Sequence, residues 1–99
     1  MSQAGVLSSI VYIDTERFIE AGEMRIVQTE YRLQLFENEV VASASVFKLP
    51  NIWDVSYKSF SQDANLLYLH THRGVITYRV YEDPNHFVKT FKKLKNSYY

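Results

Sequence analysis

The sequence contains no cysteine. Disulfide bonds, thiolate nucleophiles and cysteine-ligated metal sites are therefore excluded together. A chain without cysteine is compatible with a reducing compartment, and we expect a cytoplasmic protein.

Glycine and proline are also scarce, with three glycines and two prolines among 99 residues. Gly5, Gly22 and Gly74 stand singly, so the chain has no glycine-rich loop that could cradle phosphates, and a nucleotide-dependent reaction loses its usual support. There is no linker, internal repeat or low-complexity tract. Because 46% of the residues are hydrophobic, we expect residues 1–99 to form a single domain with its own core.

An excess of charge of one sign is missing as well, since 11 basic residues balance 11 acidic ones. A neutral chain attracts phosphate polymers weakly, and we expect no nucleic-acid partner. The halves differ: residues 1–50 hold four basic against seven acidic residues, net −3, and residues 51–99 hold seven against four, net +3. This asymmetry is compatible with one basic patch, although nothing else in the sequence supports contact with a membrane surface. The apolar stretch near the N-terminus is interrupted by Ser8, Ser9 and Asp14, so we expect neither a signal peptide nor a membrane span there.

Alternation of apolar and polar residues is the main secondary-structure signal, because successive side chains of a strand point to opposite faces. Residues 31–36 form a predicted strand with three apolar side chains on one face, Tyr31, Leu33 and Leu35. After the polar residues 37–39, we expect a second strand over 40–47 that opposes them with Ala42, Ala44 and Val46.

A second hairpin is predicted from residues 66–71 and 75–81, joined through His72, Arg73 and Gly74. An even-numbered loop gives one apolar face, in which Leu69 pairs with Tyr78, Thr71 with Ile76 and Leu67 with Val80. The other face is mixed and expected to be partly solvated, and it carries Tyr68, His70, His72, Thr77, Arg79 and Tyr81.

Three further segments have weaker alternation. Pro50 and Asn51 precede a strand in which Trp53, Val55 and Tyr57 point one way, which core packing explains, and a turn follows at 61–63. Residues 5–13 and 23–29 indicate two more strands. Between them, residues 15–22 fit either a short helical turn ending at Gly22 or a strand and loop, so the sequence leaves the structure of 14–23 open.

The end of the chain has the signals of a helix start. Asp83 can cap exposed backbone amides, and Pro84 suits the first helical position. A helix of about 12 residues then has an apolar stripe of Phe87, Val88, Phe91 and Leu94 and a basic opposite face. The predicted fold class is therefore mainly β (α+β): an antiparallel bent sheet or partly open barrel of about six or seven strands, closed by one C-terminal amphipathic helix.

This order of elements resembles the pleckstrin-homology superfold, and in particular its small bacterial members. Residues 49–94 carry the resemblance, with the segments NIWDVSYKSF, LLYLHTHRGVITYRV and DPNHFVKTFKKL. The resemblance implies a bent seven-stranded barrel plugged by its helix, and a module that binds phosphoinositides, peptides or proteins rather than an enzyme. Members that bind phosphoinositides have basic residues around the first hairpin loop, whereas residues 14–23 contain Arg17 among four carboxylates, so we expect no inositol phosphate there.

Two histidines two residues apart, His70 and His72, point to the same face of a strand and could share a metal. They form an incomplete site, and no spacing enforces a third ligand from Glu82, Asp83 or His86, so we predict no metal and no cofactor. The sequence also lacks a nucleophile elbow for hydrolysis, and we expect no enzyme activity.

Basic residues give the one candidate ligand site. Arg73 and the helix lysines could bind phosphate or an acidic partner, although lysines on the wet face of a helix need no such role. The candidate set is His70, His72, Arg73, Lys89, Lys92 and Lys93.

The sequence thus predicts a non-catalytic binding module that recognises a protein or peptide, at a free strand edge or in the groove beside the C-terminal helix. The alternatives are binding of an anionic ligand or lipid headgroup by the basic residues, and a small metal-dependent enzyme. A free edge can also pair with a second copy, so a homo-oligomer is compatible with the sequence.

Overall fold

The computed structural model describes residues 5–61 and 63–98, and the side chains of this set up to Asn96. Gln62, in the predicted turn at 61–63, lies outside the described residues. These residues form seven strands, one short 3-10 helix and one α-helix: β1 (Ser8–Glu20), β2 (Glu23–Leu35), β3 (Glu39–Val41), β4 (Val46–Lys48), η1 (Leu49–Asn51), β5 (Ile52–Ser61), β6 (Ala64–Thr71), β7 (Gly74–Val80) and α1 (Asn85–Tyr98). The predicted class, mainly β with one C-terminal helix, is confirmed.

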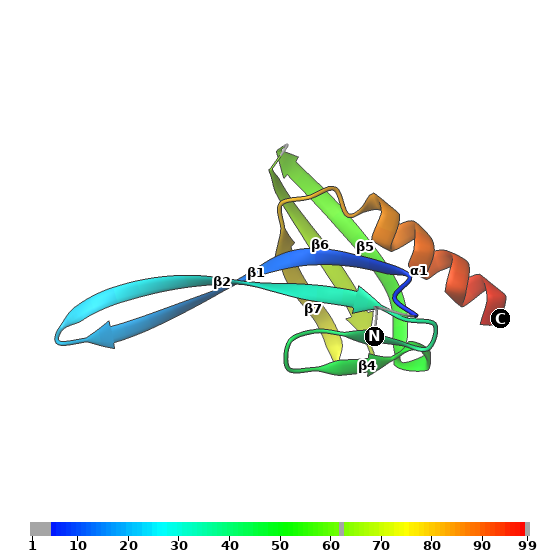
Figure 1. The fold of residues 1–99 in the computed structure, drawn as a ribbon, viewed down its shortest axis with the longest axis horizontal. Helices are drawn as coiled ribbons and strands as arrows, with labels where there is room; N and C mark the ends of the chain where they lie inside the picture. Colours follow the sequence, from blue (N-terminus) through cyan, green and yellow to red (C-terminus); the bar gives the residue numbers. More distant parts are fainter. Residues whose placement is uncertain (1–4, 62, 99) are drawn as a thin grey trace.

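All seven strands belong to one antiparallel sheet with the order β4-β3-β2-β1-β7-β6-β5. The first four strands form one meander and the last three form another, and β1 and β7 join the two. β4 and β5 are the outer strands and do not pair with each other, so the sheet is bent but not closed (Figure 1).

The core lies inside the bend and is covered by α1, which packs against β5 and β1. Phe87 and Phe91 are each 1% exposed, as the predicted apolar stripe requires. The helix begins as predicted, because the backbone N–H of Asn85 donates to the Asp83 carboxylate over 3.0 Å and satisfies an amide that has no partner within the helix.

The hairpin of β6 and β7 has the predicted faces but not the predicted register. Leu67 pairs with Tyr78, Leu69 with Ile76 and Thr71 with Gly74, which is two residues away from the predicted pairing. The cause lies in the turn, where only two residues separate Thr71 from Gly74. The Thr71 hydroxyl donates a hydrogen bond to the Gly74 carbonyl and accepts one from the Arg73 amide. A slip of two residues keeps every side chain on its own face, so the core pattern could not detect it.

The first predicted hairpin is wrong in its details. The strands expected at 23–29 and 31–36 are one continuous strand, β2, and the strand expected at 40–47 is two short strands that pair with each other. Val40, not Ala42, stands opposite Leu35. The chain turns at residues 42–45, where small residues follow each other and leave little apolar area to hold a longer strand.

Trp53 and Tyr57 do not belong to the core, contrary to the prediction for β5. The register of β5 shifts between Ile52 and Asp54, so Trp53 is the extra residue of a bulge and is 67% exposed. Val55 is fully buried as expected, whereas Tyr57 is partly exposed. The bulge turns Trp53 away from the face that Val55 and Tyr57 still share opposite Leu69 and Leu67, and it does not account for the exposure of Tyr57.

The segment 14–23, which the sequence left open, is the end of a long β-hairpin. β1 and β2 pair along their whole length and turn at Ala21 and Gly22, whose φ angles are 53° and 79°. Positive φ at both central residues is typical of the two-residue turns that match the twist of a hairpin. We name residues 14–30 the arm.

The arm projects from the body and gives the molecule its elongated shape (Figure 1). The principal extents are 53 × 32 × 30 Å, and the radius of gyration is 15.0 Å, against about 13 Å for a compact domain of this length. Asp14 to Gln28 are all exposed. Within the described residues, no helix combines the length and apolar character needed to cross a membrane.

Candidate functional site

A free strand edge begins where the arm leaves the body. β1 pairs with β7 through only two residue pairs, Tyr12 with Val80 and Ile13 with Arg79. Beyond them β1 continues into the arm, whereas β7 continues back to Gly74 and pairs there with β6 alone. Residues 74–78 therefore have one unpaired side, on which every second residue points its N–H and C=O groups away from the sheet.

This edge is better formed than the two outer edges of the sheet. β4 has only three residues, and β5 has irregularities near both ends and is packed by α1. In contrast, β7 pairs with β6 without a register shift. Bulges and short strands make an edge less able to pair with an additional strand, and β7 has neither feature.

Two carboxylates explain why β1 leaves β7. If the observed register of β1 and β7 continued, Asp14 would stand opposite Tyr78, and Glu16 would stand opposite Ile76. Tyr78 and Ile76 face the core, and directly paired residues share a face of the sheet. Continued pairing would thus carry both carboxylates over the apolar interior, where a charge without a partner is costly. In the arm, both are exposed.

β1 and β7 separate beyond the pair of Ile13 and Arg79, and we name this point the fork. A pocket of about 200 Å³ lies at the fork, between β1, β7 and the turn that joins β3 to β4. Tyr12 lines this pocket, and its ring meets that of Tyr78 edge to face with centroids 4.7 Å apart. The Tyr12 hydroxyl donates to the Ser43 hydroxyl and accepts from the Ser43 amide, each over 3.1 Å. The pocket lining consists of Tyr12, Ile13, Asp14, Ala42, Ser43, Ala44, Ser45, Thr77 and Tyr78.

Tyr78 is the second aromatic residue of the pocket. Burial and, to a smaller extent, the neighbouring Tyr12 raise the pKa of Tyr78 to about 12. Desolvation has this effect because it penalises the charged phenolate. The pocket therefore combines two aromatic residues, small side chains on the β3–β4 turn and a free backbone edge, with Asp14 as the single charged residue in the lining.

The candidate residues of the second hairpin do not form a ligand site. His70 faces outward as predicted, but its Nε2 is hydrogen-bonded to the Ser56 hydroxyl at 2.9 Å, and it stands opposite Asp54. His72 and Arg73 occupy the two-residue turn and are exposed. In the described part of the chain, no group of three or more His, Asp or Glu side chains is placed to hold a metal ion.

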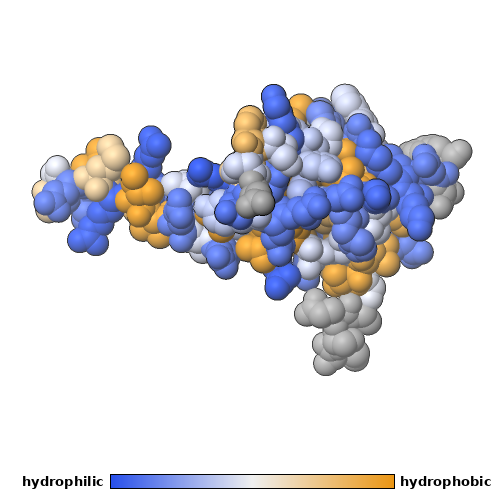
Figure 2. All heavy atoms as spheres, turned by 90° about the horizontal axis from the view of Figure 1, so that it is seen from above, coloured by the Kyte–Doolittle hydropathy of each residue, from blue (hydrophilic) through white to orange (hydrophobic). Residues whose placement is uncertain are grey.

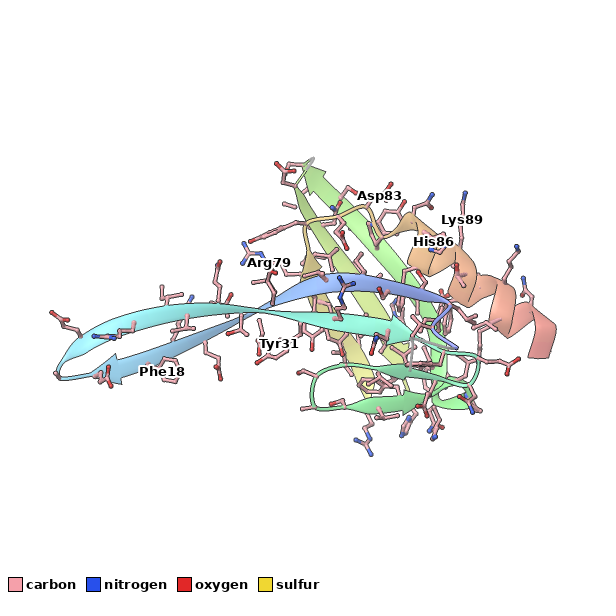
Figure 3. All side chains as sticks on the ribbon, in the orientation of Figure 1. Phe18, Tyr31, Arg79, Asp83, His86 and Lys89 are labelled. Carbon is pink, nitrogen blue, oxygen red and sulfur yellow. The ribbon has the colours of Figure 1, made fainter. Side chains whose placement is uncertain are left out.

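The candidate lysines gather elsewhere, on the outer face of α1. Lys89, Lys92 and Lys93 line a pocket of about 450 Å³ together with His86, because residues three and four apart are neighbours on a helix. Lys92 also lies 3.5 Å from the Asp54 carboxylate. Neither His72 nor Arg73 lines this pocket, so the predicted basic set is divided between two places. Figure 3 shows His86 and Lys89 on α1.

Sequence reasoning missed the residues at the fork. Tyr12 and Tyr78 were assigned to strands, but nothing in their spacing brings residues 66 positions apart together. Asp14 and Glu16 did carry a signal, since they place charges on the face that Ile10 and Tyr12 bury. That break in the pattern of an otherwise continuous strand indicates where β1 leaves the core.

Comparisons with family models, with curated proteins and with solved structures give no match to this chain.

Proposed function

We propose that the protein is a non-catalytic module that recognises an extended peptide segment of a partner protein at the free edge of β7. The observation that carries the proposal is the early departure of β1, which leaves residues 74–78 paired on one side only. An added strand satisfies such an edge with backbone hydrogen bonds, and neighbouring pockets select its side chains. No catalytic group is needed for this activity.

The fork also favours a particular kind of peptide. A strand placed beside β7 would direct every second side chain toward Tyr78 and the half-buried Ile76, which suits an apolar residue. Asp14 lies at the rim of the same pocket and suits a Lys or Arg. We propose that the segment combines an apolar residue with a nearby basic one.

The pleckstrin-homology-like architecture is part of this proposal. It is supported by the two consecutive meanders of four and three strands and by the C-terminal helix that packs its phenylalanines into the core. The long arm is a departure from a bent barrel of even strand length. The module would share with that superfold a scaffold for binding rather than for catalysis.

Selection from a displayed library of random 12-residue peptides tests the proposal. Selected peptides should contain the apolar and basic pair, and in hydrogen exchange they should protect alternate amides within residues 74–78. Ser45→Trp fills the pocket and should weaken binding at least tenfold, whereas Ser61→Trp, at a serine of β5 that is also exposed, should not. A selected peptide that protects β5 amides instead, or a library that yields no binder, contradicts the proposal.

A second candidate is the binding of an anionic ligand, favoured by the three lysines around one pocket on α1. Titration with inorganic phosphate or with vesicles containing anionic lipid tests it. Binding should fall steeply with added salt and with Lys89→Gln and Lys93→Gln, and a ligand that binds equally at high salt would contradict it.

A further inference from the structure

The arm exposes apolar side chains on both of its faces. The pairing of β1 with β2 places Phe18 and Val27 on one face, and on the other it places Ile19, Met24 and Ile26, which we name the tip patch. The tip patch is the most exposed apolar surface of the arm, at 79%, 63% and 59% respectively. Figure 2 shows apolar atoms among hydrophilic ones along the projection. A contiguous exposed patch of this kind marks an interaction surface.

An apolar pocket lies on the outer face of the β5–β7 meander. It has a volume of about 390 Å³, and we name it the outer pocket; it is lined by Phe60, Ala64, Asn65, Leu66 and Arg79. The ammonium group of Lys58 lies 5.4 Å from the centre of the Phe60 ring. The outer pocket therefore combines an apolar floor with two cations at its rim.

The tip patch and the outer pocket lie on the same face of the sheet. Ile13 pairs with Arg79, and Arg79 pairs with Leu66, so these three side chains point to one side. Along β1, Ile19 is on the same side as Ile13, because it is an even number of residues away. The six residue steps from Ile13 to Ile19 correspond to about 20 Å. The tip of the arm is thus too far away to reach the pocket of its own chain.

We propose that the occupant of the outer pocket is the tip patch of a second copy of this chain. In a two-fold arrangement, the arm of each copy crosses the outer face of the partner's β5–β7 meander. The tip patch and the outer pocket are then both covered, and the contact closes on itself as most dimer interfaces do. This inference does not depend on peptide binding at β7, which uses a different surface.

The distribution of charge favours contact between the arm of one copy and the body of the other over contact between the two arms. Residues 14–30 contain two arginines and five carboxylates, net −3, so the rest of the neutral chain is net +3. Glu20 and Glu23 pair at the end of the arm on the face opposite the tip patch, and Arg17 stands opposite Ile26 on the tip-patch face, so the attraction toward Lys58 and Arg79 beside the outer pocket comes from the net charge of the arm as a whole. Contact between two arms would instead bring together two segments that each carry a net charge of −3.

The area is sufficient for a dimer of modest affinity. Seven residues of β1 beyond Ile13 give an arm about 23 Å long, and two strands with their side chains are about 10 Å wide. Two arms and two receiving faces then bury about 1,000 Å² in total, at the lower limit for a specific interface. We expect the dissociation constant to lie in the micromolar range.

Sedimentation of the full chain between about 1 and 500 μM tests the proposal. The protein should pass from monomer to dimer, and Ile19→Ser with Met24→Ser should raise the dissociation constant at least tenfold. Val46→Ser, which removes an apolar side chain of comparable exposure on β4, should leave it unchanged. A protein that stays monomeric throughout, or a dimer unaffected by the tip variants, overturns the proposal.

Cysteine cross-linking tests where the arm lies, because the natural chain has no cysteine. When the Ile19→Cys and Ala64→Cys proteins are mixed and oxidised, a disulfide should join one to the other. Ser45→Cys in place of Ala64→Cys should give no such product. Efficient joining of Ile19→Cys to itself would show that the arms meet each other and would overturn the placement.

Discussion

Asparagine substitution at two adjacent residues of β6 gives a direct test of the fold. Leu69 is fully buried between Val55 and Ile76 on the neighbouring strands, whereas His70 points to the outer face and bonds Ser56. The same new side chain therefore enters two opposite environments, one residue apart.

The expected magnitudes differ severalfold. Leu69→Asn removes buried apolar volume, which costs about 2–5 kcal/mol, and leaves an amide without partners, which costs about 1–3 kcal/mol more. His70→Asn loses one hydrogen bond, worth about 0.5–1.5 kcal/mol. For a domain of this length, the first change should lower Tm by about 15 °C or more and the second by only a few degrees.

Urea unfolding followed by circular dichroism measures the loss of stability in each variant. The midpoint should shift far more for Leu69→Asn than for His70→Asn, with similar slopes so that the shifts report stability. Equal shifts, or the larger shift at His70, would refute the assignment of the two faces of β6.

Three further predictions concern single groups. Asp83→Ala should destabilise the protein by about 0.5–2 kcal/mol in urea unfolding, because the Asn85 amide loses its cap. The pKa of Tyr78 is raised to about 12 from 10 in the unfolded chain, so between these pH values the Tyr78 side chain ionises readily only in the unfolded chain. Stability should therefore be full below pH 10 and fall as the pH rises from 10 toward 12, and unfolding of Tyr78→Phe should lack this component of the pH dependence. Ala21→Gly should increase amide protection in the arm, since Ala21 has a φ of 53° that costs a non-glycine residue about 1 kcal/mol; unchanged exchange would contradict this.

Local signals explain what the sequence predicted well. The helix start depends on Asp83 and Pro84 within two residues of each other, and the stripe of Phe87 and Phe91 depends only on helical period. The two faces of β6 and β7 follow from period two, but the same period cannot distinguish registers that differ by two residues, so the turn decided the pairing.

Non-local geometry explains what the sequence did not predict. The bulge that exposes Trp53 arises from the pairing of β5 with β6, which no local pattern encodes. The arm has no buried face that would produce alternation, so 14–23 could not be assigned. The fork depends on where β1 and β7 separate, and the lysines of α1 were grouped with His70 and Arg73 although the fold places them on a different element.

The carboxylates at the base of the arm connect the free edge of β7 to the arm itself. If Asp14 and Glu16 keep β1 away from the core, then Asp14→Val with Glu16→Val should let β1 continue along β7, with the new side chains over Tyr78 and Ile76. Amides in residues 74–78 that exchange quickly in the natural chain should become protected, and peptide binding at this edge should be lost. Thr15→Val with Arg17→Val is the matched control, because these side chains point to the opposite face and should leave the amides unprotected. If the edge of β7 stays open in the first variant, the bend of β1 has another cause, and the carboxylates are merely solvated.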